Sequence, residues 1–206
     1  MYRGEISEAT IRRLPIYYRN ICSMQTEGIE KTTSSELGKR SGNTGTQVRQ
    51  DFFSCGGGPK YNVLEIKAWL EEKMAINTKH RAVLVGAGNL GRAIVNCKDY
   101  QTDNFFITAA FDNNLLFEGI QINGIPILNV NLLEKYLENN PTDIVIIATP
   151  DSTAKNIFNM AKEKGVKGVW NFTSVDLQSD DNIAVSSVHI SDSLMTLFFK
   201  MNNIQE

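Results

Sequence analysis

The first part of the chain carries apolar residues at the spacing of amphipathic helices. In residues 7–27 they recur every three or four positions, which predicts a helix with one buried face. These positions are Ile11, Leu14, Tyr18, Ile21 and Cys22. Ser7 is expected to cap this helix and Gly28 to end it, whereas Pro15 is expected to weaken or kink its first half.

Three more helices are expected, at residues 32–41, 44–53 and 63–74. Gly42 separates the first two of them, so a longer helix is followed by two short helices across a small-residue turn. This order is typical of a helix-turn-helix. The glycine-rich segment at residues 55–63 is where a winged helix has its wing, and we expect a tight hairpin there.

The helix at residues 44–53 would be the recognition helix, whose N-terminal side chains face base edges. The candidate base-reading residues are Thr44, Thr46, Gln47, Arg49 and Gln50. Glutamine can bond adenine, and arginine guanine, through two hydrogen bonds, while Lys39, Arg40 and the wing residue Lys60 suit phosphates. The alternative is a plain three-helix bundle with solvated polar faces, and the pattern alone does not decide between the two.

From residue 80 onward, short apolar strands alternate with helices. Strands are expected at residues 82–85, 105–111, 119–127, 143–148 and 166–172, and helices at 92–98, 132–137 and 153–164. Asp151 or Ser152 is expected to cap the last of these helices, and Gly165 to end it. The nearly all-apolar run at 143–148 suits a parallel sheet that is covered on both faces. The alternation predicts an α/β fold with a Rossmann-type, doubly wound parallel sheet.

The first of these strands runs directly into the sequence Gly86-Ala87-Gly88-Asn89-Leu90-Gly91. A G-x-G-x-x-G between a strand and a helix is the dinucleotide-binding fingerprint, because its glycines allow a tight turn, a close approach to pyrophosphate and close helix packing. The next strand ends in Asp112, 21 positions after Gly91. A carboxylate there can hold a ribose diol and would repel the 2′-phosphate of NADP. The pattern predicts an NAD(H) site; the alternative is a strand–helix–strand unit that binds nothing.

Ligands of such sheets bind at the carboxyl ends of the strands. This rule adds further candidate cofactor-binding residues, namely Asn113, Thr149, Pro150, Asn171 and Phe172. For Thr149 and Asn171 the alternative is that they are loop residues whose side chains bond the local backbone.

The last predicted helix, at residues 192–201, is too apolar for a free surface helix. We expect it to pack either on its own sheet or on a partner subunit. The chain is thus predicted to contain a DNA-binding domain (1–79), an NAD(H)-binding domain (80–190) and a C-terminal dimerisation helix (191–206).

Composition narrows the class of protein further. The 206 residues are 42% hydrophobic and 21% charged, as in ordinary globular proteins, and no apolar run approaches the roughly 18 residues of a membrane span. The N-terminus lacks the apolar core of a signal peptide, so we expect a cytoplasmic protein. Three widely spaced cysteines predict neither a metal site nor a disulfide. Residues 1–79 carry a net charge of +3 and the remainder −5, a mild indication that the first part contacts nucleic acid.

Several motifs together resemble the Rex family of redox-sensing transcriptional repressors over essentially the whole chain. They lie at residues 13–19 (RLPIYYR), 46–52 (TQVRQDF), 85–93 (VGAGNLGRA), 109–112 (AAFD) and 165–172 (GVKGVWNF). The resemblance implies a homodimer with an N-terminal winged helix, an NAD(H)-binding Rossmann domain and a C-terminal helix exchanged between subunits. It also implies that NADH releases the dimer from palindromic operator DNA, whereas NAD⁺ permits binding.

Two residues mark a departure from the family pattern. That pattern commonly pairs an Arg of the winged helix with a Tyr after the first nucleotide helix and an Asp before the exchanged helix. Here Arg19 is retained, but the other two positions hold Cys97 and His189. The wing is also shorter than usual. The alternative function is therefore a Rex paralogue that binds NAD(H) but has impaired DNA binding or an altered redox response.

Two further alternatives belong to other classes of protein. An NAD-dependent dehydrogenase would need a proton donor near the nicotinamide and a substrate domain of appreciable size. His80 precedes its strand, at the end away from the site, and the segment after the last predicted strand is too short for such a domain. We therefore expect no catalytic residues and no enzyme. The third candidate is a dinucleotide-binding partner protein without a role on DNA.

Overall fold

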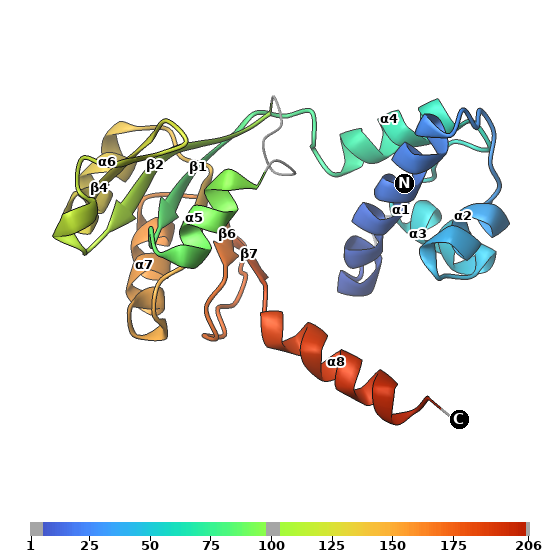
Figure 1. Cartoon of the computed structure of the whole chain (residues 1–206). Coiled ribbons are helices and arrows are strands. Elements are labelled where there is room, and N and C mark those ends of the chain that lie inside the picture. Colours follow the sequence, from blue (N-terminus) through green and yellow to red (C-terminus); the bar gives the residue numbers. More distant parts are fainter. Residues whose placement is uncertain (1–5, 98–103, 205–206) are drawn as a thin grey trace. The chain divides into compact units, whose positions relative to one another are not determined.

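The computed structural model describes residues 6–97 and 104–204 (Figure 1). The chain separates into two compact units, Met1–Thr78 and Lys79–Glu206. The described part of the first unit is built from helices around one hydrophobic core. The second unit contains a sheet with a core on each of its faces.

Over residues 6–78, the first unit contains four helices: α1 (Glu8–Thr26), α2 (Ser34–Ser41), α3 (Gly45–Ser54) and α4 (Val63–Lys73). Each begins at a side-chain cap, whose oxygen accepts the N–H of the residue three positions later. The caps are Ser7, Thr33, Thr44 and Asn62. Gly28 and Gly42 end α1 and α2 with φ of +77° and +70°, the left-handed conformation that favours glycine. The four predicted helices are confirmed.

The core of the first unit lies between these helices. Its largest buried side chains include Leu14, Tyr17, Ile21, Met24, Leu37, Phe52, Ile66 and Leu70. The ring of Phe52 in α3 meets Tyr17 of α1 edge-on, at 5.9 Å between centroids, and Trp69 of α4 at 4.7 Å. These aromatic contacts fix α3 against both of the longer helices.

Two local features of this unit differ from the simple expectation. α1 runs through Pro15 without interruption, because the exposed proline ring removes only one backbone hydrogen bond while Leu14 and Tyr17 anchor the buried face. The expected wing hairpin is wrong. Within the described residues, the one β-bridge of segment 55–62 joins Asn62 to Lys31, which lies before α2, so no two parts of the segment pair with each other as a hairpin would.

A seven-stranded sheet runs through the second unit in the order β3-β4-β2-β1-β5-β6-β7. The strands are β1 (His80–Val85), β2 (Phe105–Asp112), β3 (Gln121–Ile122), β4 (Ile125–Asn129), β5 (Ile144–Ile147), β6 (Gly168–Asn171) and β7 (Ala184–Ser187). All neighbouring strands are parallel except β3 and β4. Without the β3 edge, this is the 3-2-1-4-5-6 order of dinucleotide-binding folds, whose switch point lies between β1 and β5. The predicted doubly wound sheet is confirmed.

Helices cover both faces of the sheet. Successive residues of β1 point to opposite sides: Val83 and Val85 pack with α6 (Leu133–Asn139) and α7 (Asp151–Glu163), while Leu84 packs with α5 (Asn89–Asn96). Short 3-10 turns, η2 (Leu115–Phe117) and η3 (Val130–Leu132), follow β2 and β4. The helix expected at 92–98 is α5, and its expected end, Lys98, lies outside the described residues.

Three expectations for the second unit need correction. The single strand expected at 119–127 is the pair β3 and β4, joined through Asn123 and Gly124 with φ of +50° and +81°, the two positive angles of a type I′ hairpin turn. α7 begins at Asp151 and has Pro150 as its N-cap, so capping by Asp151 or Ser152 is wrong. β7 was not foreseen, because it is only four residues long, mostly exposed, and half serine.

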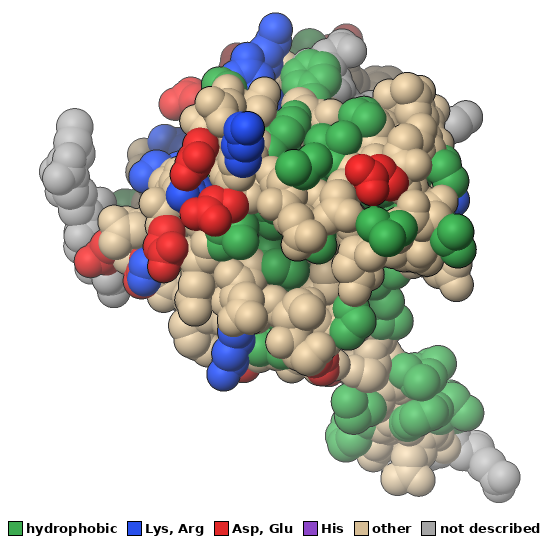
Figure 2. All heavy atoms as spheres, turned by 90° about the vertical axis from the view of Figure 1, so that its left-hand side faces the viewer, with side chains coloured by type: hydrophobic (Ala, Val, Ile, Leu, Met, Phe, Trp, Pro, Cys, Tyr) green, Lys and Arg blue, Asp and Glu red, His purple; other side chains and the backbone are tan. Residues whose placement is uncertain are grey.

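The C-terminal helix α8 (Ile190–Asn202) has no buried residue. Its large exposed side chains are Ile190, Leu194, Met195, Leu197, Phe198, Phe199 and Met201. Figure 2 shows such hydrophobic side chains, in green, gathered along the helix at the lower right. An apolar surface of this kind on a helix is stable in water only when something covers it.

Candidate nucleotide cavity and nucleic-acid interface

The glycine turn after β1 is held tightly on both sides. Gly86 donates its N–H to the carbonyl of Phe111 in β2 at 2.8 Å, and its φ is +101°. A Cβ at this position would lie 2.3 Å from the carbonyl oxygen of Ala148, which follows β5. Only glycine can therefore make this turn at the switch point of the sheet.

The other two glycines of the motif have opposite surroundings. A Cβ on Gly91 would lie 1.9 Å from the carbonyl oxygen of Gly86, so α5 packs directly against the turn. A Cβ on Gly88 would meet no atom within 4 Å. Gly88 is also the N-cap of α5 and leaves the helix without a side-chain cap. The backbone at Gly88 is thus open to a ligand, and the helix N-terminus beside it favours an anion.

Asp112 is anchored to the same turn. Its Oδ2 accepts the N–H of Ala87 at 2.7 Å, and its Oδ1 accepts the N–H of Asn114 at 2.8 Å. Both bonds use backbone donors, so the carboxylate is fixed at the carboxyl end of β2, and each oxygen still has a lone pair for a further donor.

Arg92 supports the turn from α5. Its Nε donates to the carbonyl of Ala87 at 2.9 Å, and its guanidinium lies over the ring of Phe117 at 4.6 Å from the centroid. Sequence reasoning did not single out this arginine, although its position directly after the third glycine was a usable signal.

A cavity of about 670 Å³ lies at this edge of the sheet. Six of the predicted cofactor-binding residues line it: Gly86, Gly88, Asp112, Asn113, Thr149 and Pro150. α7 adds further lining residues that the sequence did not indicate, namely Ser152, Thr153, Asn156, Ile157 and Met160. Thr153 donates its hydroxyl to Thr149 at 3.0 Å, which ties the loop after β5 to the helix. Pro150 caps α7 without a side-chain bond, so a second helix N-terminus borders the cavity.

The other predicted cofactor residues are not part of the cavity lining. Ala87, Asn89, Leu90 and Gly91 belong to the glycine turn and the first turn of α5. Phe172 packs on Trp170, at 4.7 Å between ring centroids.

Asn171, another predicted cofactor residue, is fully buried inside a local network. Its amide nitrogen donates to the carbonyl of Val175 at 2.9 Å and to the hydroxyl of Ser187 at 3.1 Å, while its oxygen accepts the N–H and the hydroxyl of Thr173. The side chain therefore holds the loop after β6 and the edge strand β7.

In the first unit, α2 and α3 meet at close range. A Cβ on Gly38 would lie 2.8 Å from the carbonyl carbon of Thr44, and one on Gly45 would lie 2.9 Å from the Cα of Ser35. The two helices therefore approach each other as a helix-turn-helix requires, because both contact points are glycines.

The side chains expected to read bases fall into two groups. Thr44, Thr46, Arg49 and Gln50 are exposed. Arg49 is oriented by two neighbours, since its guanidinium donates to the hydroxyls of Ser34 at 2.8 Å and Thr46 at 3.0 Å. Gln47 is half-buried and points its amide at Asp51, one turn later, at 3.0 Å. The structure gives Gln47 a partner within the protein, which the sequence did not reveal.

Asp51 is the centre of a buried network between α1 and α3. Its carboxylate accepts hydrogen bonds from Thr10, Arg13, Tyr17 and Gln47. Burial alone would raise the pKa of Asp51, but these donors outweigh it and lower that pKa to about 2. The hydrogen bonds to Asp51 likewise raise the pKa of Arg13 above its usual range. The pair is charged at every ordinary pH and locks the recognition helix to α1.

The cations expected to meet phosphates also differ from one another. Lys39 and Lys60 are exposed. Arg40 is engaged by two carboxylates, Glu27 at 2.7 Å and Glu36 at 3.1 Å. Its charge is therefore largely offset within the protein.

Comparison with known proteins places both units in one family. Residues 5–52 match the family model "Putative DNA-binding protein N-terminus", and residues 77–175 match the CoA binding domain. The chain is 35% identical over 208 residues to the redox-sensing transcriptional repressor Rex of Clostridium tetani, covering 99% of each chain, and 36% identical over 207 residues to that of Clostridium botulinum, covering 98% and 99%. This chain belongs to the Rex family of redox-sensing transcriptional repressors.

Solved structures of the Rex family share the whole architecture. The crystal structure of RSP, a Rex-family repressor, is 32% identical and superimposes with a TM-score of 0.90, covering 97% of this chain and 95% of RSP. RSP in complex with β-NAD⁺ and operator DNA superimposes with a TM-score of 0.88, covering 97% of this chain and 94% of that one. RSP has also been solved with β-NADH, at a TM-score of 0.89 and 97% and 96% coverage.

The three residues at the positions of the expected Arg–Tyr–Asp pattern lie at element ends or on the surface. Arg19 is exposed on α1. Cys97 is half-buried and is the C-cap of α5, while His189 is half-buried and is the N-cap of α8 without a side-chain bond. Within the described residues, no helix is long and apolar enough to cross a membrane, and no cluster of potential metal ligands occurs.

Proposed function

We propose that this protein is a homodimeric repressor that binds palindromic operator DNA through α2 and α3 and senses the NADH/NAD⁺ balance, with NADH weakening operator binding. The observation that carries the proposal is the open backbone at Gly88 beside the anchored carboxylate of Asp112, in one cavity at the switch point of the sheet.

The residues present fit a dinucleotide. The first-turn N–H groups of α5 beside Gly88 suit a pyrophosphate, and Asp112 suits the ribose hydroxyls. The carboxylate of Asp112 favours NAD(H) over NADP(H) because it would repel a 2′-phosphate. The cavity wall formed by Thr149, Pro150 and α7 is left for the nicotinamide end. When bound, the nucleotide would supply a nicotinamide ring whose charge depends on its oxidation state, and the protein would respond to that charge with a change in operator affinity.

On the DNA side, exposed residues of α3 support base reading. Thr46, Arg49 and Gln50 are the proposed readers, while Lys39 and Lys60 contact phosphates. Gln47 and Arg40 contribute less, because Asp51 holds the first and two glutamates hold the second. The DNA role is also supported by RSP, which is 32% identical in sequence to this chain and has been solved in complex with operator DNA.

The division of labour follows the domains expected from the sequence, with residues 1–79 for DNA, 80–190 for NAD(H) and 191–206 for dimerisation. The exposed apolar side chains of α8 support exchange of this helix with a second subunit. A cytoplasmic location suits a protein that must meet DNA and NAD(H). Regulation in place of turnover is proposed, since the Clostridium relatives are named as redox-sensing transcriptional repressors.

A second form of this function is supported by the altered residues. Arg19 has Cys97 and His189 where the family pattern has a tyrosine and an aspartate, the wing forms no hairpin, and Arg40 is engaged internally. We propose on these grounds that the redox response is retuned relative to other Rex proteins, so that a given NADH level changes operator affinity by a different factor.

The decisive experiment selects a palindromic duplex from a random pool with the full-length protein, then titrates it by fluorescence anisotropy with NAD⁺, NADH or no nucleotide. The expected result is specific binding with NAD⁺ that NADH weakens. Calorimetric titration of both nucleotides without DNA checks the cavity independently. NADH binding without selection of any palindrome would overturn the repressor function and leave a dinucleotide-binding paralogue.

A further inference from the structure

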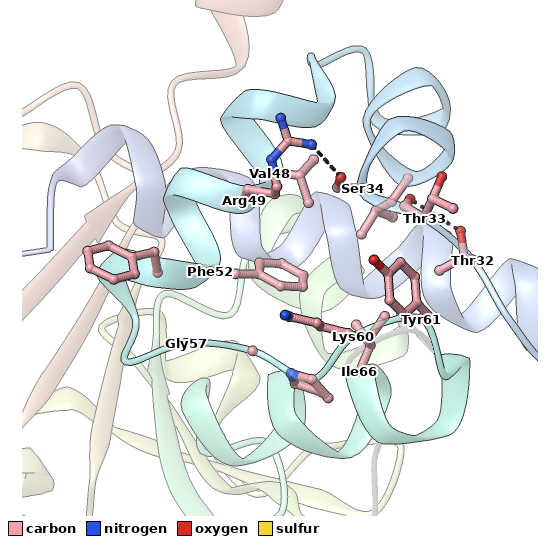
Figure 3. A pocket seen from close by; sticks show the side chains of 14 residues that line it. Thr32, Thr33, Ser34, Val48, Arg49, Phe52, Gly57, Lys60, Tyr61 and Ile66 are labelled. Carbon is pink, nitrogen blue, oxygen red and sulfur yellow. Dashed lines mark hydrogen bonds between the residues drawn. The ribbon is translucent and has the colours of Figure 1, made fainter.

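A second cavity, of about 300 Å³, opens beside the recognition helix within the first unit (Figure 3). α3 forms one wall, the start of α2 another, and the glycine-rich loop 57–61 a third. The deepest lining is apolar and consists of the buried side chains Leu37, Val48, Phe52 and Ile66. The loop lies directly on the aromatic floor, because a Cβ on Gly58 would come within 2.6 Å of the Phe52 ring.

The charged side chains of this cavity are all of one sign. Arg49 and Lys60 line it, and among the 14 lining residues that the structure describes none is acidic. Figure 3 shows these two side chains on opposite sides of Phe52 in that view. Arg49 is held in place by its hydrogen bond to Ser34, drawn as a dashed line, whereas Lys60 is exposed.

An apolar hollow with a few fixed polar groups at its edge is the usual form of a small-molecule site, and this volume is at the small end of the range for such sites. The lining includes the aromatic rings of Phe52, Phe53 and Tyr61, which favour an aromatic ligand. Two cations without an opposing carboxylate favour an anionic group on that ligand.

We propose that this cavity binds a small aromatic carboxylate, with its ring against the apolar lining and its carboxylate between Arg49 and Lys60. Such a ligand is a second input, separate from the nucleotide cavity of the other unit. Its regulatory consequence rests on the proposed function: Arg49 and Lys60 are proposed DNA contacts, so a ligand that neutralises both of them weakens operator binding.

The first test is calorimetric titration of the full-length protein with 3-phenylpropionate, 3-phenylpropanamide and acetate. The proposal expects saturable binding of 3-phenylpropionate, binding at least about tenfold weaker for the uncharged amide because it lacks the charge-assisted bonds, and none for acetate, which lacks the ring. No saturable binding of 3-phenylpropionate, or equal binding of acid and amide, would overturn it.

Variants then locate the site. Arg49→Gln and Lys60→Gln should each weaken 3-phenylpropionate binding about tenfold, because each removes one cation from the cavity edge. Lys39→Gln is the matched control: it removes the same charge from an exposed residue of α2 that does not line the cavity, and it should leave 3-phenylpropionate affinity unchanged. Equal affinity in all three variants would place the compound elsewhere and overturn the assignment.

The DNA arm separates this inference from the proposed function. If the selected duplex binds, saturating 3-phenylpropionate should weaken it in the wild type, with no such effect from the amide at the same concentration. Unchanged duplex affinity at saturation would overturn the regulatory consequence. If no duplex binds at all, the repressor function fails, while the calorimetric result still decides whether the cavity takes an aromatic carboxylate.

Discussion

Arg13 and Asp51 form a bidentate salt bridge between α1 and α3, with Nε–Oδ2 and Nη2–Oδ1 distances of 2.7 Å each. The Asp51 side chain is 1% exposed and that of Arg13 is 22% exposed. Because Asp51 belongs to the recognition helix, the bridge couples the stability of the first unit to the placement of the side chains proposed to read DNA.

Removing one partner of this bridge should be costly. Asp51→Ala leaves Arg13 and the hydroxyl of Tyr17 without their acceptor, and breaking such a buried pair costs about 3 kcal/mol in the free energy of unfolding. Urea unfolding followed by circular dichroism measures it. Arg12→Ala is the control, because its ion pair with Glu8 is almost fully exposed and should contribute less than about 0.5 kcal/mol. Equal effects of the two substitutions would contradict the role of the network.

The same bridge predicts that the free energy of unfolding falls at acidic pH. The pKa of Asp51 is lowered from an ordinary value of 3.8 to about 2 in the folded protein. A lowered folded pKa means that the stabilisation is complete above pH 3.8 and is lost as the pH falls toward about 2. We expect the free energy of unfolding to drop by about 2 kcal/mol across that interval, and Asp51→Asn to flatten the drop. An unchanged drop in that variant would assign it to other carboxylates.

The local elements could be predicted from the sequence because their signals are local. The caps at Ser7, Thr33 and Thr44 and the glycine after each of the first two helices act within one turn of the chain. The glycine motif and Asp112 also follow from spacing, since the strand–turn–helix geometry fixes where each side chain must lie.

What escaped prediction depends on contacts between distant segments. From the sequence, the amide of Gln47 is expected to contact a base. In the structure it donates to the buried carboxylate of Asp51, one turn later, which also accepts hydrogen bonds from α1. Asn171 reads as a cofactor residue, but Ser187, 16 positions away, lies within reach only because β7 pairs with β6. The single strand expected at 119–127 is a different case, because the Asn123–Gly124 pair is itself a local signal for a type I′ hairpin turn.

The two glycines Gly88 and Gly91 should respond in opposite ways to alanine. Gly91→Ala forces a Cβ against the turn and should cost roughly 2 kcal/mol of stability, because neither backbone can move away. Gly88→Ala meets no protein atom and should stay within about 0.5 kcal/mol of the wild type, yet weaken NADH about tenfold by projecting into the cavity. Thermal unfolding without nucleotide and calorimetric titration with NADH separate the effects. Normal NADH affinity in Gly88→Ala would show that the nucleotide does not pass this point.

Asp112 should set the preference between nucleotides. Asp112→Ala removes the carboxylate that would hold the ribose hydroxyls and repel a 2′-phosphate, so NADH affinity should fall about tenfold while the ratio of NADH to NADPH affinity moves toward one. The variant must be shown to fold, because the carboxylate also accepts two backbone N–H groups. An unaltered NADH to NADPH ratio in a folded variant would remove Asp112 from the site.

The exposed face of α8 predicts the subunit state. Phe198→Asp places a charge among apolar side chains that are exposed in the single chain and would be buried in a dimer. Burying this charge at the subunit contact would cost several kcal/mol. Light scattering on the eluting peak should show half the mass of the wild-type dimer at the same concentration. Lys200→Glu, a charge change at an already polar position of the same helix, should keep the dimer mass. Loss of the dimer should also affect DNA binding, because a palindromic duplex requires two half-sites to be bound together. The Phe198→Asp variant should lose most of its affinity for the duplex and keep its affinity for NADH. A dimer of unchanged mass in Phe198→Asp would contradict the assignment of α8 to the contact between subunits.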